Sequence, residues 1–264
     1  MWEKMIAYIL THGDALLVQI GTHLWISLAA LAAAVLIGVP CGYLAADSPG
    51  IEKWISAPFH VLRVIPSLAI LVLLIPIAGT GALPAVIALT ILAVPPVLLN
   101  TIVGFRDVPF FMTESAAGIG MTDREILWKV RVPLALPMIF AGIRTALVEV
   151  IASAALAARI GAGGLGEVIF TGLGLNRMDL LLLGGILVAA LSLLCGGLFD
   201  ALTRRLMPYR NLCKQRVKRL QIPSLLVQLR TFDERPHMSM EVYFAKNEQN
   251  GLGVRMCGAM RERK

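Results

Sequence analysis

Three glycines, Gly161, Gly163 and Gly166, have the G-x-G-x-x-G spacing of a dinucleotide-binding loop. The segment before them, "VEVIAS", contains enough β-branched residues to form a strand. Asp179 follows at about the distance, roughly 20 residues, at which such a loop places an acidic residue on the ribose. The pattern therefore predicts a membrane-bound dinucleotide-dependent enzyme, provided that the loop joins a strand to a helix on the cytoplasmic side.

The other polar residues do not form a catalytic pattern. The sequence contains no P-loop G-x-x-x-x-G-K-[ST], no nucleophile elbow and no H-E-x-x-H. Its four cysteines form no C-x-x-C pair, and no histidine lies at metal-ligand spacing. We therefore expect no metal site, no cofactor on this chain and no hydrolysis of ATP by it.

The composition is that of a membrane protein, with 57% hydrophobic and 16% charged residues and a mean hydropathy of +0.77. The formal net charge of +7 is unevenly distributed. Residues 1–210 hold 13 Lys and Arg against 12 Asp and Glu, whereas residues 211–264 hold 11 against 5. The basic excess belongs to the C-terminal tail, so it does not indicate a nucleic-acid partner.

Five apolar segments approach the length of about 20 residues that a bilayer-spanning helix needs. They are Leu24–Ala46, Leu62–Ala78, Leu83–Val103, Met138–Ala158 and Leu180–Leu206. The glycine motif ends the fourth apolar run, which is too long for a strand. The sequence therefore predicts an all-α membrane protein with about five transmembrane helices, and favours a turn over a cofactor site at the glycines.

The basic residues predict the orientation, because loops on the cytoplasmic side carry an excess of Lys and Arg. With the N-terminus outside and the C-terminus inside, nine basic residues lie in inner loops and three, Lys4, Arg159 and Arg177, lie outside. We expect residues 1–20 to form an external segment and residues 21–210 the transmembrane domain. The polar, basic tail, 211–264, lacks a sustained period and is expected to be disordered, with a basic cluster that could touch anionic lipid.

The predicted inner loop at residues 104–137 is too long and too patterned for a passive connector. A helix is expected from Asp107 and Pro109 to about Ala117, and Gly118 and Gly120 should end it. Thr122 and Glu125 form a T-x-x-E capping box for a second helix, which Pro133 should stop. Its apolar stripe, Ile126, Leu127 and Val130, could dock into a groove of a cytoplasmic partner or lie in the lipid interface.

This loop resembles the EAA loop of binding-protein-dependent ABC importer permeases. Glu114, Ser115 and Ala116 stand at E-A-A, Gly120 at the glycine, and Val130, Val132 and Pro133 at the closing I-x-L-P. The resemblance implies a type I ABC importer permease fold and a loop that docks onto a separate ATPase. The implied coupling residues are Glu114, Ser115, Ala116, Gly120, Thr122, Ile126, Leu127, Val130 and Pro133.

Four further strings resemble permeases for quaternary-ammonium osmoprotectants such as glycine betaine, choline or carnitine. They are "VIPSLAILVLLIP", "LLNTIVGF", "PLALPMIFAGIRTA" and "IGAGGLGE". Leu99 stands where many relatives have Arg, so another small solute such as methionine stays an alternative. The resemblance implies an ATPase carrying ATP and Mg²⁺, an extracytoplasmic binding protein, a second permease subunit and a bacterial plasma (inner) membrane.

Charged and helix-breaking residues inside the spans are candidates for the translocation pathway, because charges at membrane depth are costly. They are Pro66, Ser67, Asn100, Arg144 and Glu149. Ordinary packing roles are equally open: a kink at Pro66, a helix–helix hydrogen bond of Asn100, and snorkelling of Arg144. Gly161, Gly163, Gly164 and Gly166 are expected to form a tight external turn with close helix approach between spans four and five.

Overall fold

A computed structural model describes residues 2–47, 50, 57–59, 62, 67–207, 242–247 and 251–256. Residues 2–207 belong to a helical unit, and the two short strands belong to a separate C-terminal unit. The helices are α1 (Trp2–Thr11), α2 (Gly13–Asp47), α4 (Ser67–Ala78), α5 (Ala82–Arg106), α6 (Phe110–Gly118), α7 (Asp123–Ile126), α8 (Val132–Ala157), α9 (Gly166–Gly174) and α10 (Met178–Leu206). A π-turn, η1 (Leu127–Arg131), joins α7 to α8, and a 3₁₀ turn, η2 (Ala158–Ile160), follows α8.

Four helical stretches within the described residues are long and apolar enough to cross a membrane: α2, α5, the continuous run from α7 through η2, and α10. The first crossing helix begins earlier than the sequence predicts, at Gly13 instead of Leu24, and its 35 residues extend about 52 Å. The paired Pro95 and Pro96 do not interrupt α5, because both rings are buried among neighbouring helices.

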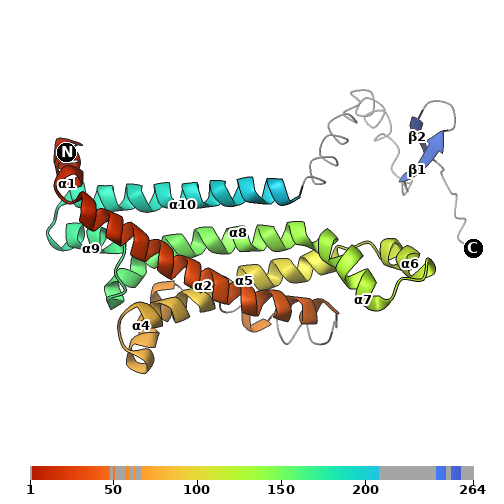
Figure 1. Cartoon of the computed structure of the whole chain (residues 1–264), viewed down its shortest axis with the longest axis horizontal. Coiled ribbons are helices and arrows are strands. Elements are labelled where there is room, and N and C mark those ends of the chain that lie inside the picture. Colours follow the sequence, from red (N-terminus) through yellow and green to blue (C-terminus); the bar gives the residue numbers. More distant parts are fainter. Residues whose placement is uncertain are drawn as a thin grey trace, which may run out of the picture. The chain divides into compact units, whose positions relative to one another are not determined.

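The predicted second span, Leu62–Ala78, is described at Leu62 and as the 12-residue helix α4, and Pro66 lies outside the described residues. Two contacts define the ends of the helical unit here. Asp47, at the end of α2, is ion-paired with Arg131 beside α7, while the amide of Gly81, before α5, donates to the carbonyl of Ile160 at the opposite end (Figure 1). The described residues thus place Asp47 and Gly81 at opposite ends of the helical unit, and the shorter apolar helix α4 precedes Gly81.

The core lies where α2, α5 and α8 pack together, and small residues allow their backbones to approach. Gly42 of α2 faces Thr101 of α5, and a Cβ atom there would lie 2.7 Å from the Thr101 Cβ. Gly142 of α8 faces Asn100 of α5 with the same 2.7 Å spacing. Larger side chains at these positions would push apart the helices that form the centre of the unit.

The C-terminal unit contains an antiparallel hairpin of β1 (Val242–Asn247) and β2 (Gly251–Met256), with Asn247 paired to Gly251 at its closed end. The sequence analysis predicts no folded element here, so this hairpin differs from the expectation. An isolated two-stranded hairpin is marginally stable in water.

Candidate functional site

The segment between α5 and α8 lies at one end of the helix bundle, opposite α1 and α9 (Figure 1). Asp107 closes α5, with its amide donating to the carbonyl of Val103, instead of opening the next helix as predicted. Helix α6 begins at Phe110 after Pro109, whose extended backbone precedes the first turn. The predicted short helix is thus present, shifted by a few residues.

A left-handed turn and a capping box separate α6 from α7. Gly120 has φ +87°, and the amide of Met121 donates to the carbonyl of Ala116 at 3.1 Å, which satisfies the end of α6. The hydroxyl of Thr122 accepts from the amide of Glu125 at 3.4 Å, and the Glu125 carboxylate accepts from the amide of Thr122 at 3.1 Å. The predicted capping box is therefore confirmed.

The prediction that Pro133 stops the second helix is wrong. The amide of Val132 donates to the carbonyl of Leu127, five residues back, in the π-turn η1. A proline clashes with the carbonyl four residues before it inside a regular α-helix, and the wider π-turn relieves that conflict. Pro133 therefore sits in the first turn of α8, and α7, η1 and α8 form one continuous path into the membrane-spanning region.

The apolar stripe of the second helix lies largely against the protein itself, with Val130 half-buried, and its role in docking stays a prediction. Ile126 is buried, and Leu127 packs against the cluster of Phe105, Ala135 and Ile139. The most exposed apolar side chains of this segment are Phe110, Phe111, Ile119 and Trp128, each more than 60% exposed. We call these four residues the exposed apolar surface.

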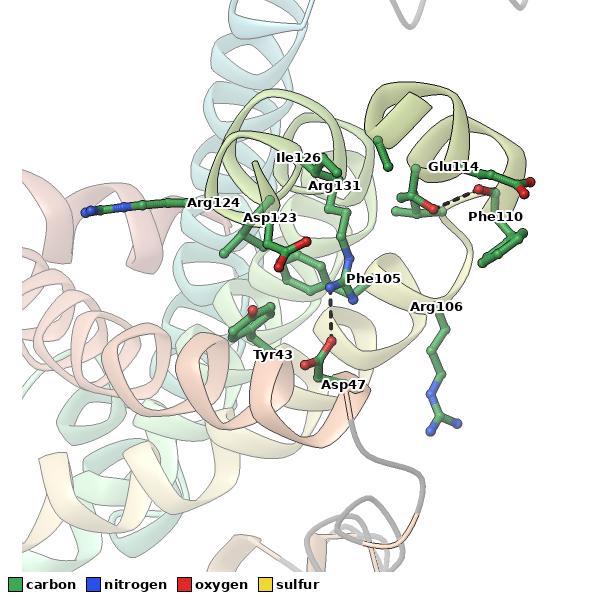
Figure 2. A pocket seen from close by; sticks show the side chains of 14 residues that line it. Tyr43, Asp47, Phe105, Arg106, Phe110, Glu114, Asp123, Arg124, Ile126 and Arg131 are labelled. Atoms are coloured by element: carbon green, nitrogen blue, oxygen red, sulfur yellow. Dashed lines mark hydrogen bonds and ion pairs between the residues drawn. The ribbon is translucent and has the colours of Figure 1, made fainter. Parts of the chain in front are cut away.

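An open pocket of about 990 Å³ lies between this segment and the ends of α2 and α5. Figure 2 shows its charged walls, with Glu114 and Asp123 on the segment between α5 and α8 and Asp47 at the end of α2. Arg131 Nη1 donates to Asp47 Oδ1 at 3.0 Å (Figure 2). Glu114 and Ser115 are exposed, while Ala116 is buried in the helix contact.

Residues 38–208 match the family described as "Binding-protein-dependent transport system inner membrane component". The chain belongs to this family of membrane transport permeases. It is a multi-pass membrane protein.

The permease is 43% identical over 206 residues to the carnitine transport permease protein OpuCB of Listeria monocytogenes, a match that covers 78% of this chain and 94% of the relative. It is 37% identical to the glycine betaine/carnitine/choline transport system permease protein OpuCB of Bacillus subtilis, over 78% and 95% of the two chains. Among solved structures, a chain of the MetNI methionine ABC transporter in an inward-facing conformation matches with a TM-score of 0.62 and 22% identity, over 72% of this chain and 97% of that one. That likeness confirms the type I importer permease fold.

The predicted pathway residues of the permease occupy different environments. Ser67 is the half-buried first residue of α4. Asn100 donates to the carbonyl of Pro96 on its own helix at 2.8 Å and packs against Gly142, a helix-contact position. Glu149 is half-buried on α8. Arg144 Nε lies 2.8 Å from Asp200 Oδ1, so an ion pair joins α8 to α10.

The glycine loop joins two helices, so the dinucleotide interpretation fails on structural context. Residues 132–157 form α8, without the strand that a cofactor loop requires. Gly161, Gly163 and Gly164 have φ values of +77°, +83° and +85°, the left-handed region that glycine adopts most readily. The predicted tight turn is therefore present.

The glycine loop lies close to more helices than the two spans that it was predicted to bring together. His23 of α2 is buried against Gly164, and its Nε2 donates to the carbonyl of Ile151 on α8 at 2.9 Å. A Cβ on Gly166 would overlap the carbonyl oxygen of Ala155 and lie 2.7 Å from the Ala158 Cβ. The loop thus holds α2, α8 and α9 together, a role that its spacing alone does not reveal.

Sequence reasoning missed Asp47, Tyr43 and the exposed apolar surface. Asp47 and Arg131 are 84 residues apart, and no local pattern links them. The signal for Phe110 and Phe111 was available: two adjacent aromatic residues near the start of a predicted short helix in a predicted inner loop.

Proposed function

We propose that this chain is the membrane-spanning permease subunit of an ATP-driven importer for quaternary-ammonium osmoprotectants such as glycine betaine, choline or carnitine. The observation that carries the proposal is the 43% and 37% identity to permeases named for these cargoes, across nearly their full lengths. In this assembly ATP and Mg²⁺ bind a separate cytoplasmic ATPase, an extracytoplasmic binding protein delivers the cargo, and a second permease subunit completes the pore. The assembly lies in a bacterial plasma (inner) membrane, with the N-terminus outside and the C-terminus inside.

Uptake of labelled compounds tests the cargo. The permease, its ATPase and its binding protein are expressed in a host that lacks osmoprotectant uptake, and labelled glycine betaine, choline, carnitine and methionine are supplied. Accumulation of at least one quaternary amine, dependent on the permease, is expected. Uptake of methionine alone would contradict the proposed cargo and support the alternative of a methionine permease. The MetNI methionine transporter chain shares the fold at 22% identity.

The segment from Asp107 to Pro133, which we call the coupling segment, carries the proposed docking site for the ATPase. Its apolar side chains are unusually exposed for a water-facing surface, with Phe110 76% and Ile119 80% exposed. Glu114, Asp123 and Arg124 lie around the adjacent pocket and can pair with charges on a partner. A surface with apolar side chains beside charged ones is typical of a protein interface.

Gly120 gives a test of the turn between α6 and α7. Replacing it by valine places a β-branched residue at φ +87°, which costs about 1–2 kcal/mol and shifts α6 relative to α7. A Cβ atom at this position would meet nothing within 4 Å, so the fold of the remaining helices should persist. We expect several-fold weaker capture of the ATPase and lower uptake at normal membrane levels. The charge reversal Glu114→Lys should act the same way; unaltered capture of the ATPase by both variants would remove the loop from the docking site.

Glu149 is the proposed counter-charge for a passing trimethylammonium group, because carboxylates at membrane depth are costly and usually functional. Glu149→Gln keeps the shape and removes the charge. Uptake of choline is expected to fall at least tenfold with unchanged membrane levels. Uptake equal to that of the parent protein at the same levels would assign Glu149 a packing role.

A further inference from the structure

The guanidinium of Arg131 joins three helices at the end of the bundle that carries the coupling segment. Arg131 ends the π-turn directly before α8, and it reaches Asp47 at the end of α2 at 3.0 Å. Its Cζ lies 5.9 Å from the ring centre of Phe105, near the end of α5. The Phe105 ring in turn meets Tyr43 of α2 edge to face, with centroids 5.0 Å apart. One cation thus contacts α2 and α5 while belonging to the path from α7 into α8 (Figure 2).

Stability alone does not account for this arrangement. The side chains of Arg131 and Asp47 are 25% and 55% exposed, and ion pairs at such positions contribute little to the free energy of unfolding. The neighbouring pair Lys129–Glu125 has similar geometry, at 2.8 Å, but both residues belong to consecutive turns of the same helical path. The two pairs therefore differ in what they connect: the second is local, whereas the first bridges residues 84 apart in the sequence.

Arg131 is also placed by an unusual backbone. The π-turn adds a residue to one helical turn, which changes the direction of the side chains around it relative to a regular helix. π-turns of this kind occur often at functional sites. Here the turn lies between the capped helix α7 and the spanning helix α8. A displacement of α7 would be transmitted to the membrane domain through this turn.

We infer that Arg131 is a positioning residue that makes α2 and α5 move together with the coupling segment. This inference rests on the proposed docking of the ATPase at that segment. A displacement of α7 reaches α8 through the continuous backbone, and it reaches α2 and α5 through the contacts of Arg131 with Asp47 and Phe105. Without these contacts ATP hydrolysis continues, but fewer cargo molecules cross per ATP.

The test compares three variants of the bridging pair with a matched control. Arg131→Gln and Asp47→Asn each remove the ion pair, and the exchange Asp47→Arg with Arg131→Asp restores it in reverse. Lys129→Gln breaks the local pair two residues away. We expect normal capture of the ATPase by all four proteins. The ratio of cargo transported to ATP hydrolysed should fall at least fivefold in the single variants, recover to at least half in the exchange, and stay unchanged in Lys129→Gln.

A second readout does not depend on the cargo. Spin labels are attached at Leu44→Cys and Leu134→Cys, both exposed positions on α2 and α8, after the four native cysteines are replaced by serine. In the assembled complex, the distance between the labels should stay the same with and without trapped ATP. In Arg131→Gln it should change or broaden when ATP is trapped.

The outcomes separate this inference from the proposed function. Suppose that the parent protein imports no quaternary amine, but its label distance stays constant and that of Arg131→Gln changes with ATP. This result contradicts the proposed cargo and supports the inference. A label distance that changes with ATP in the parent protein overturns the inference. Single variants whose ratio of transport to ATP hydrolysis equals that of Lys129→Gln also overturn it. Neither result bears on the proposed cargo. An ATPase that does not bind the parent refutes the docking site, and the role of Arg131 with it.

Discussion

Replacing Gly166 by alanine is expected to destabilise the permease severely or to prevent it from folding. The added methyl group would overlap the carbonyl oxygen of Ala155 and press on the Ala158 side chain. A rotamer change cannot relieve a contact with backbone, so α8 and α9 must separate. Overpacking of a core costs about 1–3 kcal/mol when side chains can adjust, and we expect more than that here. Thermal stability in detergent, followed by size-exclusion chromatography, should show a Tm at least 10 °C lower or no monodisperse peak.

Gly174→Ala is the matched control, because it adds the same methyl group to the other end of α9. A Cβ on Gly174 would meet nothing within 4 Å, and alanine is favoured over glycine in helices by about 1 kcal/mol. Its Tm should equal or exceed that of the parent protein. Equal stability of Gly166→Ala and Gly174→Ala would show that the packing around the glycine loop is looser than the structure describes.

The double substitution Phe110→Asp with Trp128→Asp is expected to abolish assembly with the ATPase. Both side chains are more than 60% exposed and belong to the exposed apolar surface. Burial of each large apolar side chain contributes about 1.5–3 kcal/mol, so losing both should weaken binding at least 100-fold. Co-purification of the tagged ATPase with the permease in detergent measures the loss, and uptake should fall to background.

The control for this prediction is Leu173→Asp, on α9 at the opposite end of the bundle. Leu173 is 61% exposed, so the substitution places a charge on another exposed apolar position without touching the coupling segment. It should leave co-purification of the ATPase unchanged. If the double variant retains its ATPase, the exposed apolar surface faces lipid or another partner instead.

Local patterns of the sequence were reliable where the interaction itself is local. The capping box of Thr122 and Glu125 needs residues three apart, and its hydrogen bonds are present. The left-handed turn at Gly120 likewise follows from a residue type that adopts that conformation readily. Hydropathy predicted the crossing helices, because their apolar length is set by the bilayer.

Other features depend on contacts that no local pattern contains. The stripe of Ile126, Leu127 and Val130 has helical spacing, but spacing does not tell whether a face contacts the protein's own core or a partner. The effect of Pro133 depends on whether the preceding turn is α or π, which the backbone of η1 decides. The glycine motif has the letters of a cofactor loop. The length of the apolar run before it favours a turn, and the helix α8 that precedes it excludes the cofactor function.

The ion pair of Arg144 and Asp200 has a consequence for what surrounds the permease. The two side chains are 53% and 36% exposed, midway along α8 and in the last third of α10. Hydrocarbon tails offer such a pair no hydrogen bonds and little dielectric screening, so their contact with it is energetically poor. The face that carries the pair is consequently suited to water or to another polypeptide, and acyl chains solvate other sides of the bundle.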